Sequence, residues 1–226
     1  MRRRVLEELE HLCRRDVDEA ARVLGLGPTQ RGEVGGNAHL KEAPCSPAIE
    51  VYAGVLYEAL EVASLTPRAR GRLDEQVAIA SALWGLVRPS DPIPSYRLSG
   101  GVTLPGIGSL AKVWRDSISA LLTEQDGLIL DMRSGAYVAL GPIPEDVAHR
   151  ALTVRVLTER NGKRSVVSHH NKATKGHLVR SLMQGRGTPG NVRALVTALE
   201  KDGHRVEVTA APRSAVPILD VIVESP

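Results

Sequence analysis

The hydrophobic positions near the start of the chain recur at helical spacing. Apolar residues within 5–12, and again within 17–24, lie three or four positions apart. Because this spacing lines one face of an α-helix, it predicts helices over residues 2–24. Asp16 stands between the two runs, where its carboxylate can cap the amide groups that begin a new helix.

Beyond this region, glycine and proline divide the chain into shorter elements. Gly25-Leu26-Gly27-Pro28 interrupts the helical pattern, and Thr29 to Asn37 is expected to form a short second helix. The prolines and glycines between Arg88 and Gly108 favour a loop. Helical spacing predicts further helices over residues 51–63, 67–86, 109–122, 172–183 and 191–201.

A different periodicity indicates strands in the second half of the chain. Short apolar or alternating runs favour strands at residues 127–132, 136–140, 152–158, 165–168, 204–209 and 218–223. Asn161-Gly162 is a strong signal for a tight hairpin. Together these elements predict the α+β class: one compact domain over residues 1–226, with a mixed sheet flanked by helices.

Composition narrows the class of protein further. Hydrophobic residues make up 42% and charged residues 24%, which excludes a mainly disordered chain. No apolar run approaches the roughly 20 residues of a membrane helix, so no membrane partner is expected. Cys13 and Cys45 lack disulfide-framework or metal-site spacing and are expected to be reduced thiols. Glu7 and Glu8 interrupt any signal-peptide core, so we expect a cytoplasmic protein.

Charge is distributed unevenly along the chain. Residues 1–150 have a net charge of −3, whereas residues 151–226 have a net charge of +6. The stretch from Arg155 to Arg193 contains nine basic residues and one acidic residue, Glu159. Such a block is a candidate surface for phosphate, either on nucleic acid or on a small ligand. The alternative is a solvated basic surface without a partner.

Residues 16–37 form a candidate helix-hairpin-helix. Gly25 and Gly27 allow a sharp turn between two short helices, and amides at the start of the second helix can face a DNA phosphate. Such contacts position a duplex without reading its sequence. An ordinary helical turn is the alternative. A similar string, Leu104 to Ala111, lacks a preceding helix and is interpreted as a loop leading to the helix of Trp114.

A second candidate site lies where a predicted strand gives way to a helix. His169 precedes that helix, and Lys172 and Lys175 are three residues apart on it, so the helix start could bind an anion. A metal site formed by His169, His170 and His177 is the alternative. Because cationic neighbours would repel a metal and no carboxylate is close in sequence, we predict no metal and no cofactor.

All six aromatic residues lie between positions 52 and 137. Four of them, together with Arg88, Asp91 and Arg97 on a proline-rich loop, are candidates for the wall of a preorganised site: Tyr52, Tyr57, Trp84 and Tyr96. The alternative is that the aromatics form the core and Asp91 pairs with an arginine. No catalytic motif is present, so no reaction is predicted.

Several strings, taken in order, resemble the YaaA family of peroxide stress proteins. They are Tyr52-x-Gly54-x-x-Tyr57, Ser81 to Pro89 with Asp91, Tyr96-Arg97-Leu98, Trp114, Arg133 to Tyr137, and Lys172 to Gly176 with Arg180. The resemblance covers roughly residues 5 to 225. Family members usually open with a short apolar strand and a Pro-Ser or Ser-Pro turn bearing a lysine. This sequence instead starts at Arg2, inside the expected first helix, so that either the start is assigned late or the segment is lost.

The resemblance implies a cytoplasmic protein with the YaaA-type fold that protects against hydrogen peroxide. It implies non-sequence-specific binding of double-stranded or damaged DNA through a basic cleft and a helix-hairpin-helix near Gly25-Leu26-Gly27. It also implies links to recombinational repair, damage tolerance and iron control.

Two hypotheses about the site follow. In the first, Lys172, Lys175 and Arg180 contact DNA phosphates beside the glycine hairpin. In the second, the protein is an enzyme for a small anionic substrate, held by Arg88, Arg97 and the same lysines, with His169 or His170 as general acid or base. Both place residues 52–137 as the wall and 155–193 as the charged floor of one cleft.

Overall fold

The computed structural model describes residues 1–166, 171–212 and 214–224. The chain forms two compact units, each assembled from separate segments. The first unit comprises Met1–Val51, Val77–Leu121 and Arg133–Pro142, and the second comprises Tyr52–Gln76, Leu122–Met132 and Ile143–Pro226. The predicted α+β class, with a mixed sheet and flanking helices, is confirmed. The expectation that residues 1–226 act as one domain stays a prediction.

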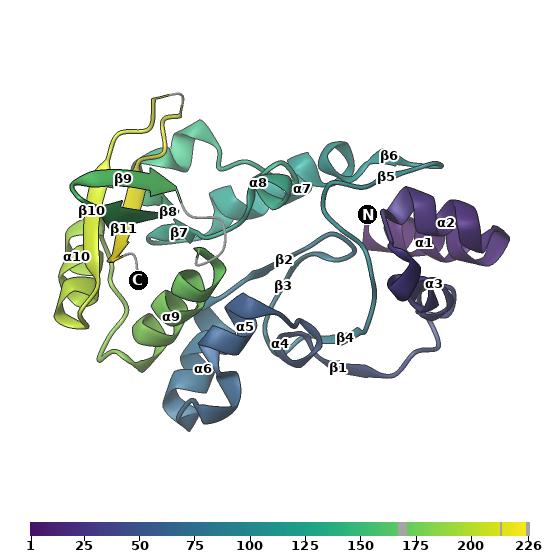
Figure 1. The fold of residues 1–226 in the computed structure, drawn as a ribbon, viewed down its shortest axis with the longest axis horizontal. Helices are drawn as coiled ribbons and strands as arrows, with labels where there is room; N and C mark the ends of the chain where they lie inside the picture. The colour runs from purple at the N-terminus through teal and green to yellow at the C-terminus, as the bar shows by residue number, and fades with distance from the viewer. Residues whose placement is uncertain (167–170, 213, 225–226) are drawn as a thin grey trace. The chain divides into compact units, whose positions relative to one another are not determined.

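The first unit combines helices with short two-stranded ribbons (Figure 1). Its strands pair antiparallel as β1–β4, β2–β3 and β5–β6. Its elements are α1 (Arg2–Arg15), α2 (Val17–Leu24), η1 (Pro28–Gln30), α3 (Gly32–Asn37), β1 (Cys45–Pro47), α4 (Ala48–Val51), β2 (Ile79–Ser81), β3 (Gly85–Val87), β4 (Pro92–Pro94), β5 (Thr103–Leu104), β6 (Gly108–Ser109), α7 (Leu110–Glu124), whose last residues belong to the second unit, and α8 (Gly135–Val138).

The boundary between α1 and α2 follows directly from the sequence. Asp16 has an extended backbone, and its carboxylate accepts hydrogen bonds from the Asp18 and Glu19 amides at 2.9 and 3.0 Å. Val5 and Leu9 on α1 and Ala20 on α2 are fully buried. The predicted N-terminal helices and their cap are therefore confirmed.

The second unit is organised around one mixed sheet. Its strands run in the order β10–β11–β8–β7, and β9 pairs antiparallel with β8. Strands β7, β8 and β11 are mutually parallel, and β10 is antiparallel to β11. The elements are α5 (Val55–Leu60), η2 (Val62–Ser64), α6 (Pro67–Gln76), β7 (Ile129–Asp131), η3 (Glu145–Arg150), β8 (Ala151–Arg160), β9 (Lys163–Val166), α9 (Asn171–Gln184), α10 (Val192–Lys201), β10 (Arg205–Thr209) and β11 (Ile218–Glu224).

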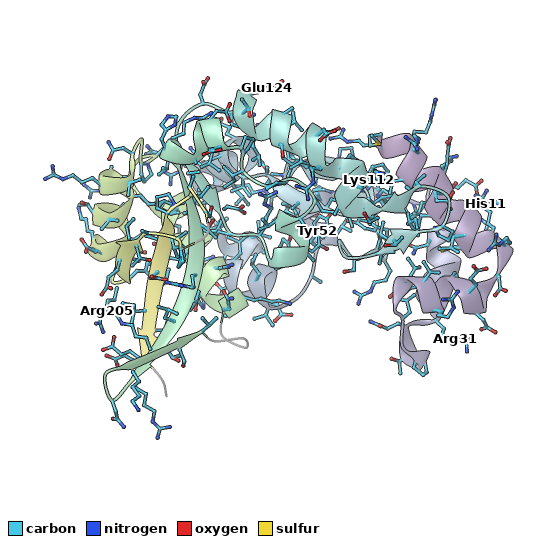
Figure 2. The ribbon with its side chains drawn as sticks, turned by 90° about the horizontal axis from the view of Figure 1, so that it is seen from above. His11, Arg31, Tyr52, Lys112, Glu124 and Arg205 are labelled. Carbon is cyan, nitrogen blue, oxygen red and sulfur yellow. The ribbon has the colours of Figure 1, made fainter. Side chains whose placement is uncertain are left out.

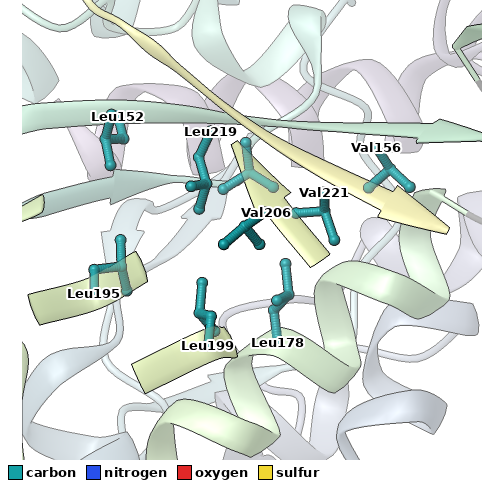
Figure 3. Packing of buried hydrophobic residues seen from close by; sticks show 9 residues of the cluster. Leu152, Val156, Leu178, Leu195, Leu199, Val206, Leu219 and Val221 are labelled. Carbon is teal, nitrogen blue, oxygen red and sulfur yellow. The ribbon is translucent and has the colours of Figure 1, made fainter. Parts of the chain in front are cut away.

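The core of the second unit lies between one face of this sheet and the helices α9 and α10 (Figure 3). Alternate residues of the strands point into it, as the period of a strand requires. They meet Leu178 of α9 and Leu195 and Leu199 of α10. The strand residues of the cluster are Leu152, Val154, Val156, Val206, Leu219 and Val221.

The hairpin between β8 and β9 is confirmed at the predicted position. Asn161 and Gly162 have φ angles of 52° and 73°, so both adopt the left-handed conformation of a tight hairpin turn. Arg160 and Lys163 face each other across this turn. The hairpin projects beyond the rest of the second unit (Figure 2).

Other predicted elements were wrong. Residues 136–140, expected to be a strand, begin within α8, because a short apolar run does not distinguish a strand from a helical turn. The helix expected over 67–86 ends at Gln76, and the chain continues as β2 and β3. The helix expected over 51–63 is interrupted at Gly54, whose φ of 104° is incompatible with a helix. Along the described residues, no helix has both the length and the apolar character of a membrane span.

Candidate functional site

The structure distributes the predicted site residues over both units. The first unit contains Gly25, Gly27, Trp84, Arg88, Asp91, Tyr96 and Arg97. The second contains Tyr52, Tyr57, Lys172, Lys175 and Arg180. His169 and His170, proposed as anion ligands or as an acid and base, lie outside the described residues. The cleft expected to join wall and floor therefore stays a prediction.

The Gly25–Gly27 hairpin is held by its own backbone. Gly25 has a φ of 66°, which ends α2, and the Leu26 amide donates to the Ala21 carbonyl at 2.8 Å. The Gly27 amide faces the Gln30 side chain at 3.4 Å, and Pro28 has no amide hydrogen. The following α-helix begins at Gly32 instead of Thr29, after a 3₁₀ turn. Two helices thus flank the hairpin, with fewer free amides beside it than expected.

A network around Ser81 joins two of the predicted aromatic residues. Ser81 is fully buried, and its hydroxyl lies 2.7 Å from the Tyr96 hydroxyl. The same Ser81 oxygen accepts a hydrogen bond from the Trp84 amide at 2.9 Å. The β2–β3 turn and the loop of Tyr96 are therefore linked through one small polar side chain that the sequence reasoning missed.

Trp114 anchors the same ribbon from α7. Its indole N–H donates to the Ala82 carbonyl at 2.8 Å, and its ring lies against Gly85. Gly85 has a φ of 80°, and a Cβ there would come 2.9 Å from the Trp114 ring. This tryptophan is buried and acts in packing, so it does not line an open site.

Asp91 closes the turn that begins at Arg88. Its carboxylate accepts a hydrogen bond from the Arg88 amide at 2.8 Å, and its own amide donates to the Arg88 carbonyl at 3.1 Å. The Asp91 carbonyl also accepts from the Ala48 amide at 2.8 Å. The Arg88 side chain is exposed beyond this turn. Asp91 thus shapes the loop through its contact with the Arg88 backbone.

Arg97 is fixed by a buried asparagine from α3. Asn37 is 1% exposed, and its amide side chain accepts from the Arg97 N–H at 2.9 Å and donates to the Arg97 carbonyl at 2.8 Å. The guanidinium of Arg97 is exposed and stays available to a ligand.

In the second unit, α5 packs directly against α9. Gly176 makes this possible, because a Cβ at that position would lie 2.2 Å from the Leu56 carbonyl oxygen. Arg180 donates to the Leu60 and Glu61 carbonyls at 2.9 and 3.1 Å and so caps the end of α5. Arg180 therefore has a structural contact that competes with its predicted role at a phosphate.

Two more predicted residues lie just before α5 and within it. Tyr52 and Tyr57 stack with their ring centroids 5.7 Å apart and an angle of 17° between planes. Both rings are half-buried. The pair presents a compact aromatic surface within the second unit.

Lys175 is a buried amine, in contrast to the exposed Lys172. Lys175 is 7% exposed, and its Nζ donates to the Met132 carbonyl at 3.0 Å, just beyond β7. Burial lowers the pKa of the Lys175 ammonium, and the nearby Asp131 carboxylate opposes this shift in part. Asp131, also buried, was missed, although a charged residue within the otherwise apolar run 127–132 was a usable signal.

The basic stretch 155–193 is partly neutralised by carboxylates from other strands. The Arg155 guanidinium donates two hydrogen bonds to the Asp220 carboxylate, at 2.5 and 2.8 Å, and this bidentate salt bridge lies on the polar face of the sheet. Arg164 contacts Glu207 at 2.6 Å and Glu159 at 2.9 Å. These pairs leave the sheet face with little net charge.

The cations without such partners lie beside the β8–β9 turn, on α9 and α10 and in the loop between these helices. Within the described residues, five exposed side chains of this stretch form no ion pair or hydrogen bond: Arg160, Lys163, Lys172, Arg186 and Arg193. Arg160 and Lys163 flank the β8–β9 turn, and Lys172 lies in the first turn of α9. The predicted charged floor is therefore smaller than the composition suggested.

Comparison with known proteins assigns the chain to a family. A family model described as Peroxide stress protein YaaA matches residues 2–208. The chain belongs to this family. The resemblance inferred from the aromatic and lysine-containing strings is thereby confirmed.

Curated relatives match almost the whole chain. A UPF0246 protein of Streptomyces coelicolor is 47% identical over 225 residues, covering 98% of this chain and 86% of the relative. A UPF0246 protein of Corynebacterium glutamicum is 40% identical over 211 residues, covering 91% of this chain and 81% of the relative.

Proposed function

We propose that this YaaA-family protein protects against hydrogen peroxide by binding double-stranded or damaged DNA without reading its sequence. The observation that carries the proposal is the set of unpaired cations in the second unit. Arg160, Lys163 and Lys172 are exposed, and no described carboxylate neutralises them. Phosphate contacts from such side chains position a protein on a duplex and give no base specificity.

The helix-hairpin-helix and the links to damage tolerance and iron control belong to the same proposal. The hairpin at Gly25 and Gly27 joins two short helices, α2 and α3. Because several of its amides are already bonded, we assign most of the affinity to the side-chain cations. In this proposal Lys175 and Arg180 support the shape of the surface, since both donate to backbone carbonyls.

Fluorescence anisotropy with a labelled duplex of random sequence tests the proposal. Wild-type affinity should fall steeply with salt, because phosphate binding releases counterions. Replacing Arg160, Lys163 and Lys172 together by alanine should lower the salt slope by about three, one for each phosphate that is no longer bound. The control is Arg205→Ala, at the arginine labelled in Figure 2. This arginine is already paired with Glu159 at 3.2 Å. Absence of duplex binding at low salt, or an unchanged slope in the triple variant, would exclude this function.

A cellular assay connects binding to protection. In a strain lacking this gene, the wild-type protein should restore growth in hydrogen peroxide, whereas the triple variant should not. Full protection by a triple variant that no longer binds DNA would contradict the link between the two.

One observation favours a second candidate function, an enzyme acting on a small anionic substrate. Lys175 is buried beside Asp131, and its lowered pKa is the property expected of a lysine that accepts a proton during catalysis. Thermal-shift screening with phosphorylated and carboxylated metabolites separates the candidates. An anion that raises the Tm of wild type but not of Lys175→Met, in the absence of duplex binding, would replace the DNA-binding function with this one.

A further inference from the structure

A pocket in the first unit has a composition that the proposed duplex binding does not explain. It has a volume of about 760 Å³ and lies between the end of α2, the loop at residues 97–103 and Tyr137. All of its lining residues belong to the first unit. None of the described residues that line it is acidic, whereas two are arginines, Arg22 and Arg97.

Both arginines have unused guanidinium groups. Among the described residues, neither side chain forms a hydrogen bond or an ion pair. By contrast, Arg14 and Arg15 on the neighbouring α1 contact Glu10 and Glu19. Two unpaired guanidiniums on one pocket favour an anion with several acceptor oxygens, and the planar fork of arginine fits phosphate well.

The backbone around both arginines is fixed before any ligand arrives. Asn37 binds the amide and the carbonyl of Arg97, and Asn37 itself is buried. Arg22 lies in the last turn of α2, which ends at the left-handed Gly25 and is anchored by the buried Leu24. Such preorganisation reduces the entropy lost on binding.

The rest of the pocket suits a flat, partly apolar group. Tyr137 is half-buried, and its ring lies against Gly100, where a Cβ would be 3.4 Å from the ring. Burial raises the pKa of the Tyr137 hydroxyl above its ordinary value. Leu98 and Val102, almost fully buried, supply apolar surface. The volume exceeds what inorganic phosphate alone would fill.

We infer that this pocket binds a nucleoside monophosphate unit, with the phosphate at Arg22 and Arg97 and the base against Tyr137 and Leu98. The bound nucleotide can come from two sources with the same chemistry: a free mononucleotide, or an unpaired terminal nucleotide of DNA. The inference goes beyond duplex binding, because it depends on the first unit, whereas duplex binding was assigned to cations of the second.

Isothermal titration calorimetry on the full chain tests the pocket. The probes are adenosine 5′-monophosphate, adenosine and inorganic phosphate. The monophosphate should bind more tightly than either of its parts. Arg22→Ala and Arg97→Ala should each weaken its binding by about tenfold, the effect of losing a charge-assisted hydrogen bond. Arg115→Ala, an exposed arginine of the same unit outside the pocket, should leave it unchanged.

A second variant tests whether the base of the nucleotide contacts Tyr137. Tyr137→Leu should weaken the monophosphate and leave inorganic phosphate unaffected. Equal binding of phosphate and monophosphate, or equal losses in the pocket variants and Arg115→Ala, would overturn the inference. Circular dichroism of each variant confirms that the fold is intact.

Oligonucleotides then identify the source and separate this inference from the proposed function. A single strand with a 5′-phosphate should displace the monophosphate if the unit comes from DNA. Failure of that strand to compete, with the monophosphate still bound, assigns the pocket to a free nucleotide. Duplex affinity of Arg22→Ala and Arg97→Ala should remain near wild type. If these variants lose duplex and monophosphate binding together, the pocket is part of the duplex surface, and a separate nucleotide site is excluded.

Discussion

The two units hold their polar side chains in different ways. In the second unit, Arg155 and Arg164 pair with carboxylates on neighbouring strands, on the face opposite a continuous apolar core. In the first unit, Asn37 and Ser81 instead bind backbone or hydroxyl groups of loops. Charge pairing neutralises the second unit's sheet, whereas in the first unit the loop that Asn37 fixes leaves the guanidinium of Arg97 without an ion pair among the described residues. A basic residue thus becomes available according to its surroundings and not according to its local sequence.

The largest effect is expected from the core of the second unit. Leu199→Ala removes a fully buried side chain between α10 and the sheet, and should lower the free energy of unfolding by about 2–5 kcal/mol. Both tryptophans, Trp84 and Trp114, lie in the first unit, so their fluorescence reports on that unit alone. If residues 1–226 form one domain, urea transitions followed by fluorescence and by circular dichroism should shift together. A fluorescence midpoint that stays at the wild-type value would show that the units unfold separately.

The next effect concerns a close contact in the first unit. Gly85→Ala and Gly108→Ala both place a side chain at a φ near +80°, which costs about 1–2 kcal/mol. At Gly85 the new methyl group also meets the Trp114 ring, adding about 1–3 kcal/mol, whereas Gly108 faces open space. Chemical denaturation of both variants measures the difference. Equal losses would show that the ribbon adjusts and that the Trp114 contact is not tight.

The smallest effect is expected in the way the thermal stability of the protein falls at acidic pH. Burial raises the pKa of Asp220, but hydrogen bonds from Arg155 and Thr209 outweigh it and hold the pKa below its usual value. A carboxylate with a lowered folded-state pKa contributes stability above its unfolded pKa, near 3.9, and loses it as the pH falls through the folded value. Thermal melts below about pH 4 should therefore show a weaker pH dependence in Arg155→Leu than in wild type. If the pH dependence below about pH 4 is the same in Arg155→Leu and wild type, the Arg155–Asp220 pair makes no net contribution to stability.

Local elements were more predictable from sequence than the site. Asp16 and Asn161-Gly162 act through neighbouring backbone, so their structures follow from a few residues. The strand expected over 136–140 was wrong because its apolar run is too short to show a period. The site depends on distant partners: Asp220 is far in sequence from Arg155, and Asn37 is far from Arg97. Spacing along the chain contains no information about such contacts, so the ion pairs within the basic stretch and the pocket at Tyr137 were missed.

The two hydrogen bonds between the Asn37 side chain and the Arg97 backbone have a consequence for the chemical ageing of the protein. Its side-chain nitrogen donates to the Arg97 carbonyl while its side-chain oxygen accepts from the Arg97 N–H, whereas an ionised carboxylate provides acceptors only. Deamidation to aspartate would replace that donor by a second acceptor and set a carboxylate oxygen against the carbonyl. The loop would lose one of its two hydrogen bonds to this side chain, and the new negative charge would attract the guanidinium of Arg97. Hydrolysis of one buried side-chain amide, which consumes water and releases ammonia, would thus act on the arginine of the pocket without altering the pocket's own side chains.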